Sequence, residues 1–384
     1  MKISRIVDEI EPSLTRKLFN MAQNYDDVID LTLGDPDLNA PDTIKKAACN
    51  AINQNKTHYS SNAGLLELRS KISQRINNSY NIPKTDYENI IVTVGGMEAL
   101  YLSLLCILDK DDEVLVFAPY YVNYLQMIKM CGAKPVIINA YNDDGFNIKK
   151  ETLNSYITSK TVAIIVNSPN NPTGDVICED MLKTIADVAE ENNLYVISDE
   201  VYKTLVYDKT DFKSISEYLS NKESFVLIDS MSKEYSMTGW RIGYVCSNKS
   251  LISAMTKMQE NIVACAALPS QYAMIEAYEN NIKTDYIVDE FKKRRDFIFE
   301  KINNIDKLKC LKPKGTFYAF VNIENTGLDS ITFAYKLLEE KHIAVVPGIA
   351  YGEKYNNYIR IAFTKEIDTL NQAIEKISDF VDSL

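Results

Sequence analysis

The chain has 384 residues, a formal net charge of −11, 46% hydrophobic residues and 25% charged residues. These values are typical of a globular protein with one large or two moderate domains, and they disfavour disorder, fibres and coiled coils. The acidic balance disfavours a nucleic-acid surface, and no apolar run approaches the roughly 20 residues that span a bilayer. Since the N-terminal segment carries charges throughout and has no apolar signal core, we expect a cytoplasmic protein that binds neither nucleic acid nor membrane.

The cysteine and histidine content limits the chemistry. The seven cysteines are widely scattered and form no C-x-x-C motif, which predicts reduced, mostly buried thiols rather than disulfide bonds or a zinc site. The only histidines, His58 and His342, lie far apart in the sequence, so a histidine-rich metal centre is excluded and a histidine triad is disfavoured. We therefore expect no metal site, and catalysis by other groups.

From about residue 90, short β-branched runs alternate with longer amphipathic segments. The runs are continuously apolar, as in strands that are buried on both faces, and helical crossovers between them predict a mostly parallel sheet. Seven strands are expected at residues 89–94, 113–118, 134–139, 161–167, 194–199, 224–229 and 242–247. The sequence therefore predicts an α/β fold with a seven-stranded sheet between helices.

Near residue 285 the pattern changes to a long amphipathic helix, shorter strands such as "TFYAFVNI" and "YIRIAF", and a terminal helix. This predicts a smaller α+β domain, which the N-terminal segment joins. We expect an N-terminal arm and part of the small domain at 1–44, a large domain at 45–285 and the small domain at 286–384. We interpret the basic cluster 292–295 on the long helix as a solvated face.

Polar features come at or just after the ends of four predicted strands: the pair Gly95-Gly96, then Asn171, Asp199 and Lys233. In open parallel sheets, ligands bind outside the carboxyl ends of the strands. Core packing alone does not explain four such features at one edge of the sheet. The glycine pair precedes a helix, and backbone N–H groups at a helix start bind phosphate well.

Lys233 follows a core strand and has the hydroxyl residues Ser230 and Ser232 just before it. A lysine whose ammonium group is desolvated loses its proton readily and can form a Schiff base with an aldehyde. Arg241, eight residues on, supplies a permanent cation suited to bidentate phosphate recognition. An aldehyde and a phosphate together describe pyridoxal phosphate.

Three motifs carry a resemblance to a known family. "SMSKEYSMTGWRIGYV" at 230–245 resembles the S-x-S-K…G-x-R-x-G segment of the pyridoxal-phosphate-dependent aminotransferases of fold type I, class I/II, the aspartate aminotransferase superfamily. "IVNSPNNPTG" at 165–174 and "ISDEVYKTLVYD" at 197–208 resemble two further motifs of that family. The resemblance extends from about residue 30 to 365, and it implies a pyridoxal 5'-phosphate enzyme with the large and small domains of fold type I.

The resemblance implies roles for the residues around the cofactor ring. Lys233 is expected to hold the cofactor as a Schiff base and to act as general base and acid. Asp199 faces the pyridine nitrogen and keeps it protonated, so that the ring accepts electrons. Asn171 and Tyr202 bond the 3′-oxygen, and Tyr121 stacks on the ring.

The phosphate and the substrate have expected partners as well. By resemblance, Gly96, Met97, Ser230 and Arg241 lie at the cofactor phosphate. Tyr59 reaches the phosphate of the neighbouring subunit, which implies a homodimer with shared active sites.

Gly34 and Asn171 are expected to line the substrate site, and Arg360 to hold the α-carboxylate of the amino acid in a bidentate manner. The implied reaction moves an amino group between an L-amino acid and a 2-oxo acid. Aspartate, aromatic or broad specificity stays open, because aspartate-specific relatives often carry lysine where this chain has Met97.

Three other functions are compatible with parts of this pattern. A carbon–sulfur β-lyase shares the fold, the cofactor and the lysine, although the intact N-P-T-G and G-x-R-x-G elements favour transamination. A regulator that uses this fold as a sensor carries an N-terminal DNA-binding domain, for which the 30 residues before the G-x-P-D loop leave little room. A catalytically dead binding module is disfavoured because Lys233, Asp199 and Arg241 are all present.

Overall fold

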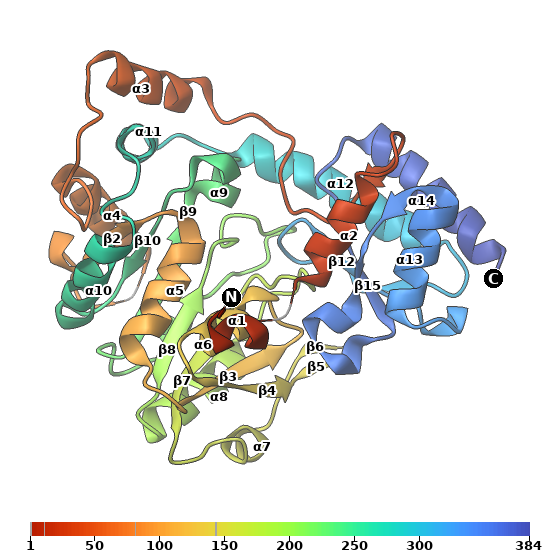
Figure 1. Ribbon diagram of the computed structural model, residues 1–384, viewed down its shortest axis with the longest axis horizontal. Helices are drawn as coiled ribbons and strands as arrows, with labels where there is room; N and C mark the ends of the chain where they lie inside the picture. The colour runs from red at the N-terminus through yellow and green to blue at the C-terminus, as the bar shows by residue number, and fades with distance from the viewer. Residues whose placement is uncertain (1, 11, 81, 143) are drawn as a thin grey trace.

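The computed structural model describes residues 2–10, 12–80, 82–142 and 144–384. At its centre lies a seven-stranded sheet of order β2-β10-β9-β8-β7-β3-β4 (Figure 1). Only β10 runs antiparallel to its neighbours, so the predicted mostly parallel sheet is confirmed. The strands are β2 (Ile90–Thr93), β3 (Glu113–Ala118), β4 (Lys134–Asn139), β7 (Thr161–Asn167), β8 (Tyr195–Asp199), β9 (Phe225–Ser230) and β10 (Gly243–Cys246). Each lies within one residue of its predicted bounds.

The two edges of this sheet differ in burial. The inner strand β9 and the edge strand β2 are buried at every residue, whereas the edge strand β4 exposes Lys134, Ile137 and Asn139. Helices flank the sheet, as expected for strands that are buried on both faces. They are α4 (Leu66–Ser79), α5 (Gly95–Ile107), α6 (Asn123–Met130), α7 (Lys150–Asn154), α8 (Glu179–Glu191), α10 (Lys249–Ile262) and α11 (Leu268–Glu279). A further helix, α3 (Asp42–Asn53), packs on α11. A small hairpin of β5 (Tyr141–Asn142) and β6 (Gly145–Phe146) lies beside the sheet.

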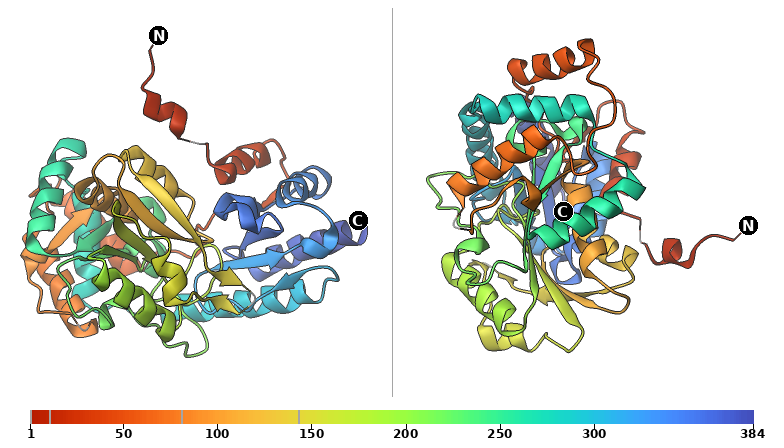
Figure 2. Two further views of the ribbon diagram at one scale, coloured as in Figure 1. Left: turned by 90° about the horizontal axis from the view of Figure 1, so that it is seen from below. Right: turned by 90° about the vertical axis from the view of Figure 1, so that its left-hand side faces the viewer.

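A second unit has its own apolar core and its own antiparallel sheet, of order β11-β12-β15-β14 (Figure 2). Its elements are β11 (Lys309–Cys310), β12 (Tyr318–Asn322), β14 (Val346–Pro347), β15 (Tyr358–Ala362), α12 (Asp285–Asn303), α13 (Ser330–Lys341) and α14 (Ile367–Asp382). The N-terminal segment packs here. β1 (Ile29–Asp30) pairs in parallel with β13 (Ile343–Ala344), and α2 (Leu14–Ala22) contacts both β13 and β14. Short α1 (Arg5–Glu9) precedes α2.

The solvated face predicted for the basic cluster 292–295 is wrong for two of its members. The side chains of Arg294 and Arg295 are only 2% and 1% exposed. Arg294 pairs with Asp37 at 2.8 Å, and Arg295 pairs with Asp208 at 2.6 Å. Because α12 packs against the rest of the molecule along this face, its two arginines become buried ion-pair partners and only the two lysines meet solvent.

The cysteines are free thiols, as predicted, but most of them are not buried. Of the seven, only Cys246 and Cys310 are buried, whereas Cys49 and Cys178 are exposed. Among the described residues, no helix is long and apolar enough to cross a membrane. The same part of the chain holds no group of three or more metal-ligating side chains.

Candidate active site

A cavity of about 450 Å³ lies at the carboxyl ends of β7, β8 and β9. The last residue of each of these strands, Asn167, Asp199 and Ser230, lines it. Because parallel strands end at the same edge, polar residues that are distant in sequence meet there. β12 and β15 of the second sheet and α2 close the opposite walls. The cavity is therefore built by both units together.

Lys233 lies on α9 (Met231–Glu234), a single helical turn that starts directly after β9. Ser230 caps this turn by accepting a hydrogen bond from the backbone N–H of Ser232. The Lys233 Nζ atom donates to the Gly34 carbonyl oxygen at 2.7 Å. Burial lowers the pKa of Lys233 to about 8, and the nearby Arg360 and Arg241 cations add to this lowering. An amine with this pKa is available as a nucleophile and base near neutral pH.

Asp199 ends β8 and its side chain is buried in the cavity wall. Its Oδ2 atom accepts a hydrogen bond from the Tyr124 hydroxyl at 2.6 Å, and Oδ1 accepts a long bond from the Val201 N–H at 3.4 Å. Burial raises the pKa of Asp199 to about 6, although the Tyr124 hydrogen bond opposes the rise. A carboxylate in this setting is stabilised by a cationic N–H donor in the cavity.

A cradle for an anion lies at the N-terminus of α5. Gly95 has φ +75°, and a Cβ atom added there would lie 2.6 Å from Nη2 of Arg241. The Arg241 guanidinium group therefore lies against the positive end of the helix dipole, a repulsive arrangement that a bound anion reverses. The hydroxyls of Ser230 and Ser232 lie 2.9 Å apart beside it. Cation, helix N-terminus and hydroxyls together suit a phosphate group.

Two tyrosines form the middle of the cavity. The Tyr202 hydroxyl lies 3.1 Å from the Tyr318 hydroxyl, and burial raises the pKa of Tyr202 well above its usual range. The Tyr121 hydroxyl contacts Met97 Sδ at 3.3 Å and accepts a hydrogen bond from Asn123 at 2.8 Å. These contacts fix the orientation of both rings.

Arg360 enters the cavity from β15 of the second sheet and is only 4% exposed. Its Nη1 atom donates to Asn171 Oδ1 at 3.0 Å, and Nη2 donates to the Thr32 carbonyl oxygen. The guanidinium carbon lies 4.3 Å from the centre of the Tyr318 ring. Within the described part of the chain, Nε has no hydrogen-bond partner although it is buried. Since a buried polar group is costly when unpaired, this atom is suited to an incoming acceptor such as a carboxylate.

The family model for aminotransferase class I and II matches residues 26–377. The chain belongs to this family. An aspartate aminotransferase of Pyrococcus abyssi is 36% identical, covering 98% of this chain and 97% of that protein. Aromatic-amino-acid aminotransferase 2 of Thermococcus litoralis is 33% identical, covering 98% and 97%. The crystal structure of an aspartate aminotransferase from Thermotoga maritima superposes with a TM-score of 0.93 at 34% identity, covering 99% of this chain and all of that one.

This protein is therefore an aminotransferase, an enzyme that moves an amino group between an L-amino acid and a 2-oxo acid. The structure brings most of the predicted site residues of this aminotransferase to one cavity. They are Gly34, Gly96, Met97, Tyr121, Asn171, Asp199, Tyr202, Ser230, Lys233, Arg241 and Arg360. Tyr59 is the exception. Its side chain is 88% exposed and does not line the cavity of its own chain.

Sequence reasoning missed several residues of the aminotransferase site. Ser13, Thr15 and Arg16 reach the cavity from α2, and Tyr124 holds Asp199. The α2 residues gave no signal, because nothing in an amphipathic N-terminal helix shows where it docks. Tyr124 lies three residues after Tyr121, and the two rings meet edge-on with their centres 5.5 Å apart, so nearness in sequence to Tyr121 could have identified it.

Proposed function

We propose that this aminotransferase holds pyridoxal 5'-phosphate in the cavity, with the reactive aldehyde at Lys233 and the phosphate at α5 and Arg241. One observation carries the proposal: a desolvated lysine, a buried carboxylate and an anion cradle surround a single cavity of about 450 Å³. When bound, this cofactor supplies an aldehyde that links the amino group of the substrate and a ring that accepts electrons from its Cα–H bond.

The residues of the chain supply the rest of the mechanism. Lys233 Nζ, with its lowered pKa, would take the proton from the substrate Cα and deliver it to C4′, the cofactor carbon that carried the aldehyde. Asp199, oriented by its hydrogen bond from Tyr124, would pair with the protonated ring nitrogen of the cofactor. Asn171 and Tyr202 would donate hydrogen bonds to a cofactor oxygen, and the Tyr121 ring would pack against the cofactor ring. Gly34 leaves the space that a side chain would fill beside Tyr318.

Visible absorbance tests this assignment directly. We expect purified protein reconstituted with pyridoxal phosphate to absorb above 400 nm. The band should decrease when an amino donor is added and return when a 2-oxo acid is added. A band that persists while pyruvate accumulates from cystathionine would identify a carbon–sulfur β-lyase instead. Protein that binds no cofactor would contradict the proposal.

The proposed assembly is a homodimer in which Tyr59 of each chain completes the site of the other. The exposure of Tyr59, together with exposed Ile52 and Leu66 nearby in the sequence, supports a surface that a second copy covers. Arg241, part of the cavity, is exposed in the single chain. Sedimentation should give twice the mass of the chain, and Tyr59→Phe should weaken cofactor binding without dissociating the dimer.

Arg360→Leu should raise KM for the amino acid about 100-fold or more, because the bidentate contact with the α-carboxylate is lost in a buried site. Arg360→Lys keeps the charge without the planar fork, so we expect an intermediate defect. Steady-state kinetics with the cofactor saturating separates this effect from cofactor loss. An unchanged KM in both variants would place the α-carboxylate elsewhere.

The uptake of pyridoxal phosphate by the cofactor-free protein should depend on pH. Lys233 has a pKa lowered to about 8, so its reactive neutral amine increases as the pH rises from about 7 to 9 and then levels off. Stopped-flow absorbance measures this rate. A rate that keeps rising toward pH 10.5 would mean that the lysine is not desolvated.

Arg16 supports a preference for dicarboxylic substrates. Among the described residues that line the cavity, four are cationic: Arg16, Lys233, Arg241 and Arg360. The last three have roles in the proposed mechanism. Arg16 is exposed, stacks over Phe19 at 5.1 Å, and forms no ion pair with any acidic side chain among the described residues. Arg16 is therefore the cation that is left to bind a second carboxylate, since Met97, which also lines the cavity, carries no charge.

Arg16→Ala should therefore lower kcat/KM for aspartate about tenfold or more, while kcat/KM for tyrosine stays within about twofold. Lys17→Ala, an exposed neighbour on α2 outside the cavity, is the matched control and should change neither value. Equal losses for both substrates would remove Arg16 from side-chain recognition.

A further inference from the structure

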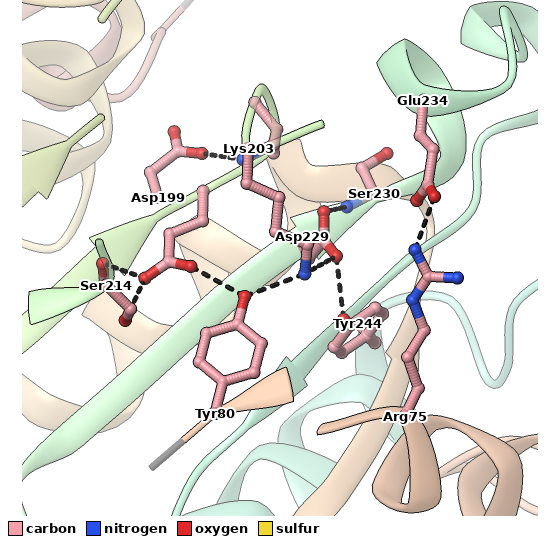
Figure 3. Close-up of polar contacts among 12 residues, drawn as sticks. Arg75, Tyr80, Asp199, Lys203, Ser214, Asp229, Ser230, Glu234 and Tyr244 are labelled. Atoms are coloured by element: carbon pink, nitrogen blue, oxygen red, sulfur yellow. Dashed lines mark hydrogen bonds and ion pairs between the residues drawn. The ribbon is translucent and has the colours of Figure 1, made fainter. Parts of the chain in front are cut away.

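A buried group of charged residues lies directly behind the cavity. The inner charge cluster consists of Tyr80, Glu200, Lys203, Asp229 and Tyr244 (Figure 3). Glu200 is 1% exposed, and the side chains of Asp229 and Lys203 are 2% and 13% exposed. No residue of the cluster lines the cavity, so the proposed mechanism leaves these buried charges unused.

The cluster alternates along the chain with residues of the site. Asp229 and Ser230 are consecutive in β9, and side chains of consecutive strand residues point to opposite faces. Glu200 follows Asp199 at the end of β8, and Lys203 follows Tyr202. Three residues of the site therefore have a buried charged neighbour that points away from the cavity.

Lys203 is the cation at the centre of the cluster. Its Nζ atom lies 2.7 Å from Asp229 Oδ2 and donates to the Tyr80 hydroxyl at 2.8 Å. Tyr80 in turn donates to Glu200 Oε2 at 2.7 Å. Lys203 thus connects a residue at the end of β9 to one just beyond the end of β8, directly through Asp229 and by way of Tyr80 through Glu200.

The carboxylates of the cluster have hydrogen-bond donors on both oxygens. Asp229 Oδ1 accepts from the Ser230 N–H at 2.7 Å, and Oδ2 accepts from Tyr244 at 2.8 Å as well as from Lys203. Glu200 Oε1 accepts from the hydroxyls of Ser198 and Ser214. A fully bonded buried network is rigid, and removing one member leaves an uncompensated charge.

The charges of the cluster influence the pKa values of residues at or next to the site. The negative charge of Asp229 contributes to the raised pKa of Asp199. Burial is the main cause of the raised pKa of Glu234. The charge of Asp229 raises this pKa further, and the charge of Lys203 lowers it. Glu234 directly follows Lys233 and pairs with Arg75 at 2.5 Å. In a dry interior, one uncompensated charge is felt across several side chains.

We infer that Lys203 is a positioning residue for the transamination site. It holds the ends of β8 and β9 at a fixed separation, and it neutralises Asp229 so that Asp199 stays ionised opposite Lys233. The inference rests on the proposed function, since its readout is the cofactor bound at Lys233. A cluster that only stabilises the sheet would change unfolding and leave the titration of the site unchanged.

A double-mutant cycle with Lys203→Met and Asp229→Asn tests this inference. The quantity measured is the pH midpoint at which the visible band of bound pyridoxal phosphate changes. Removing the cation favours protonation nearby, so Lys203→Met should raise the midpoint by about one unit, and Asp229→Asn should lower it by a similar amount. The double variant, which restores neutrality, should return to within about 0.3 unit of the unmodified protein.

Matched controls separate charge from folding. The Lys314–Asp175 pair, 2.8 Å apart, lies outside the cavity, so Lys314→Met and Asp175→Asn should leave the midpoint unchanged. Lys203→Arg keeps the charge and should retain the midpoint and kcat/KM within about threefold. Thermal unfolding of the cofactor-free variants reports stability separately.

The outcomes distinguish the two proposals. Midpoints that do not move, or that move in one direction in both single variants, overturn the role of Lys203 while the proposed function stands. Should the unmodified protein show no visible band with pyridoxal phosphate, the proposed function fails first. Opposite shifts that cancel in the double variant establish electrostatic coupling between the cluster and the site.

Discussion

Replacing Lys233 with alanine should lower kcat/KM for amino-group transfer by about 10⁴-fold or more, because the substitution removes both the covalent attachment and the general base. The Lys233 Nζ atom is the amine that burial has prepared for this role, with a pKa of about 8. The variant should still fold, since the substitution removes one described hydrogen bond, the one from Lys233 Nζ to the Gly34 carbonyl oxygen. Measurement of 2-oxo acid formation, together with the loss of the absorbance band above 400 nm, checks both effects.

Lys110→Ala is the control for lysine loss as such. Lys110 is exposed and lies outside the cavity, so its removal should leave the rate and the band unchanged. Residual activity of more than about 1% in Lys233→Ala would exceed what the remaining binding groups can supply, and would identify another base.

Asp199→Asn should lower kcat/KM by about 10² to 10³-fold, the effect of removing one preorganised charge from a buried site. Asparagine has nearly the same shape and can accept the Tyr124 hydrogen bond, which spans 2.6 Å in the present structure, so the defect isolates the negative charge. Because the carboxylate no longer pairs with a cation in the cavity, cofactor affinity should fall as well. Steady-state kinetics and a fluorescence titration with pyridoxal phosphate measure the two effects.

Tyr124→Phe is the matched comparison, since it keeps the Asp199 charge and removes only the hydroxyl. We expect a loss of about tenfold or less, together with a small rise in the pKa of Asp199, whose carboxylate then loses its short hydrogen bond. If Asp199→Asn were as active as Tyr124→Phe, the charge of Asp199 would have no part in catalysis.

The large sheet could be predicted from sequence because its signals are local. Strands such as 113–118 and 161–167 are mostly apolar runs that contain β-branched residues, and the helices between them leave few arrangements besides a parallel sheet. The edge at which Asp199 and Lys233 meet follows from the same rule. Chemistry that depends on where a strand ends is therefore accessible from sequence.

Long-range pairing was not accessible in the same way. The docking of α2 at the cavity depends on contacts with β13 and β14, which lie near the other end of the chain. The burial of Arg294 and Arg295 depends on Asp37 and Asp208, from two distant segments. No local pattern distinguishes an arginine that will meet such a partner from one that faces solvent. The inner charge cluster was missed for the same reason.

The pairing of β1 with β13 has a consequence for biosynthesis. Ile29 emerges from the ribosome early, but its partner Ile343 is made near the end of translation, so the first strand has to wait for almost the whole chain. The large sheet is complete by residue 246 and can fold before that. A nascent or prematurely terminated chain would therefore present the lysine and the anion cradle without Arg360. Because the part of the cavity wall that holds Arg360 is synthesised last, only the complete polypeptide can bind the substrate and carry out transamination.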